Sequence, residues 1–123
     1  MADVTSARID ELDSYEGVPA AVFRLARAGL GVSSFGMSII DMPPNATEYP
    51  EHDHRGDGQE EVYVTLAGSG VLEVEGERHV LDADHIARVG PGARRKILPG
   101  DEGLRLLALG GVPGQAYEPP KAP

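Results

Sequence analysis

Three side chains near the middle of the sequence have the types and the spacing that suit a divalent metal ion. His52 and His54 are separated by one residue, so in an extended segment both rings leave the same face of the backbone. Glu61 lies further along and opens an apolar run. Two imidazoles and one carboxylate form a donor set for Fe(II), Mn(II), Ni(II) or Zn(II) that leaves coordination positions open. Taken alone, an H-x-H pair in a proline-rich loop is more often simply solvated.

The strand expected to begin at Glu61 decides which of its neighbours share its face. Alternation along residues 61–66 places Tyr63 and Thr65 on the same side as Glu61. Glu60 points to the opposite face, whereas Gln59 shares the side of Glu61 and is an alternative ligand. Tyr63 and Gln59 are therefore candidates for contact with a substrate held near the metal.

Composition and charge exclude several classes of function. The 123 residues allow one domain, and 11 Lys and Arg against 20 Asp and Glu give a net charge of −9. We therefore expect no nucleic acid and no membrane as partner. With no Cys, disulfides, thiolate metal sites and cysteine nucleophiles are excluded. The sequence contains no long apolar run and no signal-peptide pattern, so we expect a cytoplasmic protein. With nucleic acid and membrane set aside, the partner we expect is a small molecule.

The elements that must position these residues are short strands. Apolar runs broken by Gly, Pro and Asn are typical of an antiparallel sandwich or barrel. We expect strands at residues 22–28, 34–41, 60–66, 70–75, 78–81, 86–89, 94–98 and 104–110, of which the first would serve a helix as well. Hairpins are predicted at residues 68–70 and 75–77, and further turns at 91–92 and 99–100.

These elements divide the chain into three parts. Residues 1–20 form an N-terminal segment with only a weak helical pattern, so we expect it to be short and irregular. Residues 21–112 form the β-barrel, and residues 113–123 form a Pro-rich tail that we expect to be extended. No internal repeat and no linker between domains is visible in the sequence.

The segment from His52 to Gly76 resembles the first conserved motif of the cupin superfamily. H-x-H is followed by E-x6-G, which runs through a strand into Gly68, and then by a second apolar run that ends in a Gly76-Glu77 turn. The resemblance covers roughly residues 34–110. It implies an all-β fold, the double-stranded β-helix or jelly-roll barrel, commonly assembled as a homodimer. In metal-binding cupins the motif's two histidines and glutamate hold the ion, and here these are His52, His54 and Glu61.

The sequence also departs from the cupin pattern. The loop between His54 and Glu61 is longer than the family usually has, and Ala46 replaces the glycine that opens the first motif. The second motif is largely lost, and Arg95 stands where the family has its fourth metal ligand, a histidine. Arginine cannot deprotonate to bind a cation. Either three protein groups and water hold the metal, or the ion is absent and the pocket has been reused.

Arg95 itself has two interpretations. Alternation sends it to the same face as Ile97, away from Arg94 and Lys96. If that face is the interior, Arg95 either clamps a carboxylate or phosphate of the ligand, or forms an ion pair with Glu61.

Other polar residues near the histidine pair are given simpler roles. Tyr49, beside Pro50, either lines the rim of the pocket or is simply a surface aromatic. Asp57 either accepts a hydrogen bond from an imidazole or belongs to the acidic surface. His85 is expected to cap a tight turn.

Together these features favour a small stand-alone cupin. It would present a divalent metal, held by His52, His54 and Glu61, to a small anionic organic ligand, with Arg95 orienting the anionic part and with chemistry of the oxygenase or isomerase type. One alternative is a non-catalytic binding or sensor cupin without metal, whose pocket is organised by Arg95. Another is an assembly partner in which the cluster is vestigial. Whether any reaction is catalysed is left open.

Overall fold

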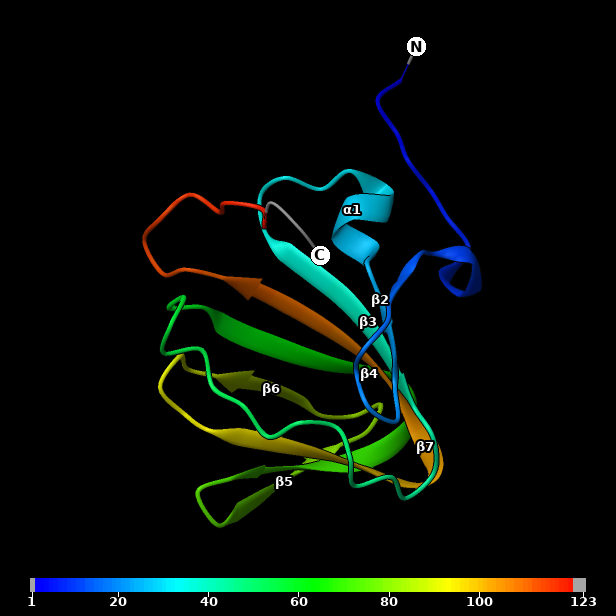
Figure 1. Cartoon of the computed structure of the whole chain (residues 1–123), viewed down its shortest axis with the longest axis vertical. Coiled ribbons are helices and arrows are strands. Elements are labelled where there is room, and N and C mark those ends of the chain that lie inside the picture. The colour runs from blue at the N-terminus through cyan, green and yellow to red at the C-terminus, as the bar shows by residue number, and fades with distance from the viewer. Residues whose placement is uncertain (1, 121–123) are drawn as a thin grey trace.

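The computed structural model describes residues 2–120, and their regular structure is almost entirely β (Figure 1). Seven strands are formed: β1 (Ser14–Tyr15), β2 (Val22–Arg24), β3 (Gly36–Met42), β4 (Glu60–Val74), β5 (Glu77–Leu81), β6 (Ile86–Val89) and β7 (Arg95–Gly111). A 3₁₀ turn at Ile9–Glu11 and the helix α1 (Ala26–Leu30) are the helical elements of the described chain. The all-β prediction is confirmed.

The sheet is built around two long antiparallel strands, β4 and β7, which pair along their whole length. The strand order is β1-β2-β3-β7-β4-β5, and β6 pairs with the first half of β4. Figure 1 shows these long strands bending so that the sheet curves over one side. Within residues 2–120 the sheet remains open, because no pairing joins β5 or β6 to the edge formed by β1 and β2. The expected barrel is thus an unclosed one.

The predicted hairpin at residues 68–70 is wrong, because this segment is a bend inside β4. The register between β4 and β7 shifts on both sides of the bend, between Thr65 and Ala67 and between Gly68 and Gly70. Gly68 has φ +73°, and a Cβ there would lie 2.1 Å from the carbonyl oxygen of Gly103. Because glycine has no side chain, the backbones of β4 and β7 can approach closely at the point where both strands bend. The turn expected at residues 99–100 likewise lies inside β7.

Other local predictions have mixed outcomes. The hairpin at residues 75–77 is confirmed: Glu75 and Gly76 both have positive φ, as a tight two-residue turn requires. The strand predicted at 22–28 is wrong beyond Arg24, because residues 26–30 form α1, which ends at Gly31 in the left-handed conformation. Of the proline-rich tail, residues 121–123 lie outside the described part, as does Met1 of the N-terminal segment.

The core lies inside the curve of the sheet, on the face that carries Tyr63 and Thr65. This is the face that strand alternation assigns to Glu61, and Leu66 on the other face is exposed. The core consists of side chains from the strands and from the loop after β3: Ile40, Met42, Tyr49, Tyr63, Leu72, Leu81, Val89, Ile97, Leu104, Leu106 and Ala108.

The N-terminal segment is attached to the sheet by a charged network. Asp41 on β3 accepts hydrogen bonds from Arg24 on β2 (2.8 Å) and from Arg105 on β7 (2.7 Å). Arg105 also donates to Asp10 in the 3₁₀ turn, at 2.6 Å. Four charges from four parts of the chain thereby fix the outer strands. None of the helices in the described chain is long and apolar enough to cross a membrane.

Candidate metal centre

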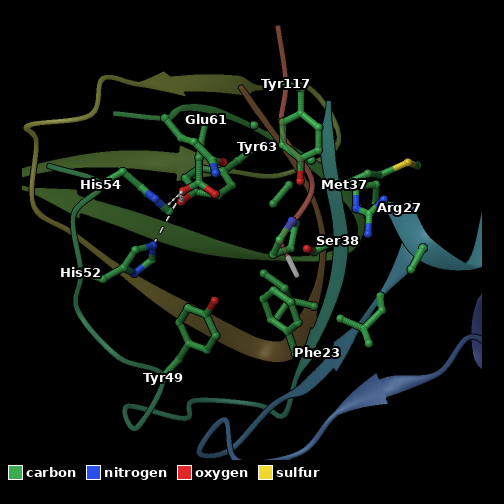
Figure 2. Close-up of a pocket in the computed structure, with 18 residues that line it drawn as sticks. Phe23, Arg27, Met37, Ser38, Tyr49, His52, His54, Glu61, Tyr63 and Tyr117 are labelled. Atoms are coloured by element: carbon green, nitrogen blue, oxygen red, sulfur yellow. Dashed lines mark hydrogen bonds and ion pairs between the residues drawn. The ribbon is translucent and has the colours of Figure 1, made fainter. Parts of the chain in front are cut away.

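The predicted trio comes together at one end of the sheet's concave face. The Nε2 atoms of His54 and His52 lie 3.2 Å and 3.7 Å from the same Glu61 oxygen, Oε1 (Figure 2). One ligand atom from each of the three residues lies within 4.8 Å of the other two. The side chains are mostly shielded, with 29% of His52, 19% of His54 and 14% of Glu61 exposed. A single small cation can therefore contact all three.

Backbone pairing holds the histidine loop against β7. His52 exchanges two backbone hydrogen bonds with Arg95, at 3.0 and 2.8 Å, and the His54 amide donates to the Pro91 carbonyl at 2.9 Å. Lys96 donates its ammonium to the carbonyl oxygens of Thr47 and Tyr49. The loop is thus extended beside His52, which is why both imidazoles leave the same face.

Hydrogen bonds to the far nitrogens orient both rings. Nδ1 of His52 lies 3.2 Å from the Pro50 carbonyl oxygen, and Nδ1 of His54 lies 3.1 Å from each carboxylate oxygen of Asp57. A carbonyl and a carboxylate only accept, so both rings donate through Nδ1. In a neutral imidazole Nε2 then carries a lone pair, and here both lone pairs face the Glu61 carboxylate. Such an arrangement calls for a positive charge between them, either a proton or a metal ion.

Glu61 is kept ionised in this setting. Burial alone would raise the pKa of Glu61, but hydrogen bonds from His52 and His54 in their protonated form and from Tyr63 outweigh it and hold the pKa well below its ordinary value. Tyr63 donates its hydroxyl to Glu61 Oε1 at 2.6 Å. The hydrogen bond with Glu61 in turn raises the pKa of His54 against the opposing effect of burial. The carboxylate is therefore ready to bind a cation without first losing a proton.

A pocket of about 470 Å³ opens beside the trio, large enough for a small organic molecule. Its walls are mainly apolar and aromatic, from β2, β3, β4 and the loop after β3. Tyr49 is among them with only 7% of its surface exposed, so of its two interpretations the structure shows the one in which it lines the pocket. Burial raises the pKa of Tyr49 to about 12, which keeps its hydroxyl protonated.

The family model described as "Cupin domain" matches residues 38–110, which is more than half of the chain and includes the whole trio. The chain belongs to the cupin family. This confirms the resemblance that the H-x-H and E-x6-G spacing indicated. No curated protein matches the chain.

Solved structures agree with this assignment at the level of fold. A cupin protein from Bacteroides fragilis has a TM-score of 0.71 at 20% identity, over 98% of this chain and 93% of that one. A sugar phosphate isomerase of the cupin superfamily from Silicibacter pomeroyi has a TM-score of 0.71 at 18% identity, covering 86% of this chain and 74% of its own. A predicted oxalate decarboxylase from Thermotoga maritima has a TM-score of 0.70 at 19% identity, with 88% and 99% covered.

In this cupin, Arg95 lies inside the sheet behind Glu61. Its side chain is fully buried, and Nη2 lies 3.7 Å from Glu61 Oε1 and 3.4 Å from the Gly90 carbonyl oxygen. Of the two arrangements considered for Arg95, the structure therefore contains the ion pair with Glu61. Arg95 is not among the residues that line the pocket, and its Nε and Nη1 have no hydrogen-bond partner within the described chain.

The remaining predicted residues separate into two faces. Gln59 and Tyr63 line the pocket beside Glu61, whereas Glu60 points away and pairs with Arg88 at 2.6 Å. The side chain of His85 pairs with the Asp82 carboxylate within its turn rather than capping a backbone group, and His79 is half-exposed on β5.

Among the pocket residues that the sequence analysis did not single out are Arg27 on α1 and Tyr117 in the tail. They lie far from the histidines in sequence, and no spacing rule connects them. Their one local signal is composition, since Arg27 is a cation in an apolar stretch and Tyr117 an aromatic residue in a proline-rich one.

Proposed function

We propose that this cupin binds one divalent metal ion through His52, His54 and Glu61 and presents it to a small organic acid in the adjoining pocket. The observation that carries the proposal is the orientation of the two imidazoles. Both rings are fixed through Nδ1, so that two Nε2 lone pairs and an ionised carboxylate converge within the reach of one cation. This donor set, with a hydrogen-bonded outer layer, is the kind that Fe(II), Mn(II), Ni(II) and Zn(II) prefer.

The chain's own residues have distinct tasks in this proposal. Tyr63 fixes the orientation of Glu61, Asp57 fixes that of His54, and Gln59 offers an amide to a ligand beside the site. The apolar walls displace water from the bound molecule. When bound, the metal supplies Lewis-acid or oxygen-activating chemistry. Relatives in fold include a sugar phosphate isomerase and a predicted oxalate decarboxylase, and the reaction class stays between isomerase and oxygenase types because fold alone does not select it.

Metal content tests the proposal directly. We expect elemental analysis of the protein, purified without a His tag or a chelating resin, to find close to one transition metal per chain. His52→Ala and Glu61→Ala should lose it. Their matched controls are His79→Ala and Glu60→Ala, which change the same residue types outside the trio and should keep it. A metal-free wild type whose melting temperature no divalent ion raises would refute the proposal.

A metal-free ligand-binding cupin is the second candidate, favoured by the ion pair between Arg95 and Glu61. The guanidinium supplies a positive charge to the carboxylate at 3.7 Å, so Glu61 is balanced without a metal. In this case a chelator should leave unchanged the rise in melting temperature that small carboxylates cause. Assembly as a homodimer and location in the cytoplasm stay predictions.

A further inference from the structure

Arg27 lies in the same pocket as the trio but away from it. The residue belongs to α1, and its part-buried side chain lines the pocket. Figure 2 shows Arg27 beside Met37, across the pocket from His52 and His54 and behind the strand that carries Ser38. The pocket therefore has a cationic group at a second, separate place on its wall.

Arg27 also differs from every other arginine in residues 2–120. Each of the eight others has a carboxylate oxygen within 4.0 Å. Within residues 2–120 Arg27 has none, although the chain carries 20 Asp and Glu and a net charge of −9. Its hydrogen bond within the described chain runs from Nη1 to the Val32 carbonyl oxygen, at 3.1 Å. This bond orients the guanidinium and leaves its remaining N–H groups without an anionic partner.

The surface between the two ends is apolar. Phe23 and Ile40 are among the apolar residues of the pocket wall, Met37 lies at the end beside Arg27, and the hydroxyl groups of Ser38 and Tyr117 lie toward the side of Arg27 (Figure 2). A ligand that is complementary to the trio, to the apolar wall and to Arg27 has one group that binds a metal, a short hydrocarbon middle and an anionic second end. Guanidinium recognises a carboxylate through two parallel hydrogen bonds, which makes a second carboxylate the simplest such end.

We propose that Arg27 is the anion-binding residue of this pocket, and that the ligand is a small dianionic acid held between Arg27 and the metal centre. The metal-bound end rests on the proposed function, whereas the end at Arg27 does not depend on it. Arg27 thereby takes the anion-orienting role for which the sequence indicated Arg95.

Calorimetric titration of the full chain tests this inference. Wild-type protein loaded with Mn(II) is titrated with the straight-chain dicarboxylates from succinate to suberate and with the monocarboxylates of equal carbon number. We expect at least one dicarboxylate to bind about tenfold or more tightly than its matched monocarboxylate, the range of a charge-assisted hydrogen bond. Arg27→Gln should abolish this preference while its Mn(II) affinity stays unchanged. Arg78→Gln, which removes one positive charge from an exposed arginine on β5, should retain it.

The outcomes separate this inference from the proposed function. Equal dicarboxylate affinities in the wild type and in Arg27→Gln overturn the inference while the metal site stands, and so does a wild type that binds no acid. If Mn(II) fails to bind, the proposed function fails, and the titrations are repeated on metal-free protein with the monocarboxylates. Their single anionic group then reports on Arg27 alone: weaker binding by Arg27→Gln supports the inference, and unchanged binding overturns it.

Discussion

At the scale of single residues, a guanidinium lies against the carboxylate that the proposed metal ion would need. Arg95 is fully buried, and its Nη2 faces the same Glu61 oxygen that the two imidazoles face. A fixed positive charge this close opposes the binding of a cation. It also stabilises the carboxylate when no metal is present, so removal of Arg95 leaves a buried charge without its partner. If the proposed metal binds, Arg95 therefore lowers the metal affinity and stabilises the metal-free protein.

Arg95→His tests this competition. Histidine removes the fixed charge and offers a fourth nitrogen at the position where the cupin pattern has its fourth ligand. We expect Zn(II) affinity, measured by competition with a chelator, to rise about tenfold or more. The metal-free variant should unfold more easily, by about 3 kcal/mol, because Glu61 loses a buried counter-charge.

The neighbouring Arg94→His is the matched control. Arg94 points to the opposite face, where it is 57% exposed and lies near Glu51. The same change there should alter neither Zn(II) affinity nor stability appreciably. Unchanged or weaker Zn(II) binding by Arg95→His would show that the guanidinium is not what limits the affinity.

The trio could be predicted from the sequence because alternation along a strand is a local rule. It places Glu61 and Tyr63 on one face and Glu60 on the other, whatever the rest of the fold does. Tyr49 could not be predicted in the same way. Its burial depends on the path of the loop after β3, which the contacts of Lys96 and Arg95 with that loop determine. Those contacts join residues more than forty positions apart.

At the scale of elements, the bend shared by β4 and β7 makes one face of the sheet concave. Gly and Ser at residues 68–70 have the composition of a hairpin turn, and a local interpretation of that composition failed. What keeps β4 continuous is its pairing with β7 on both sides of the bend, a long-range contact. Gly68 does not reverse the chain direction. It is needed at the bend because the backbone of Gly103 lies too close to its Cα for a side chain to fit.

Gly68→Ala should be strongly destabilising. The added Cβ meets backbone atoms of Gly103, the nearest at 2.1 Å, and backbone cannot move aside as a flexible side chain can. We expect a loss of about 3 kcal/mol or more in the free energy of unfolding, measured with urea. Gly76→Ala is the control: φ is also positive there, but nothing lies within 4 Å of the added Cβ, so only about 1 kcal/mol should be lost. Equal losses at the two positions would contradict the steric argument.

The charged network around Asp41 makes a prediction about pH. Burial alone would raise the pKa of Asp41, but hydrogen bonds from Arg105 and Arg24 outweigh it and lower the pKa. We expect Asp41→Asn to cost about 2 kcal/mol at neutral pH, in the range of hydrogen bonds between charged groups. Because the folded protein has the lower pKa, this contribution is complete above about pH 4, the ordinary value for Asp, and is lost as the pH falls through the lowered value.

Urea unfolding of the wild type and Asp41→Asn between pH 3 and 7 measures this difference. The stability gap should close toward the acid end of the series. Glu73→Gln removes an exposed ion pair with Arg78 and should cost no more than about 0.5 kcal/mol at any pH. A gap that stays constant with pH would mean that Asp41 contributes through packing rather than through its charge.

At the scale of the whole molecule, the two ends of the pocket are formed by different parts of the chain. The end with His52, His54 and Glu61 lies within residues 38–110, the segment that matches the cupin family. Its opposite end comes from α1 and from the tail, since Arg27, Ala28, Tyr117 and Pro120 lie outside that segment. In Figure 1 the tail returns beside the beginning of β3, near α1. The flanking segments therefore supply the end of the pocket that lies outside the family match.

The tail is held mainly by one side chain, Tyr117. The side chain is part-buried whereas its neighbours are exposed, and its hydroxyl lies 3.3 Å from the position of a Cβ at Gly36. Tyr117→Ala should open the apolar wall around Phe23 and Met37 to solvent. We expect the fluorescence of anilinonaphthalene sulfonate, a dye that binds apolar clefts, to rise clearly. The melting temperature should fall by no more than roughly 5 °C, because a part-buried side chain contributes about 1 kcal/mol or less.

Tyr15→Ala is the control for Tyr117→Ala. It distinguishes the effect of opening the pocket from the effect of losing any tyrosine. Tyr15 lies on β1, is 43% exposed and does not line the pocket, so its removal should leave the dye signal near that of the wild type. A large fall in melting temperature for Tyr117→Ala would instead make the tail part of the folding core. If both variants bind dye as the wild type does, the tail does not cover the apolar wall.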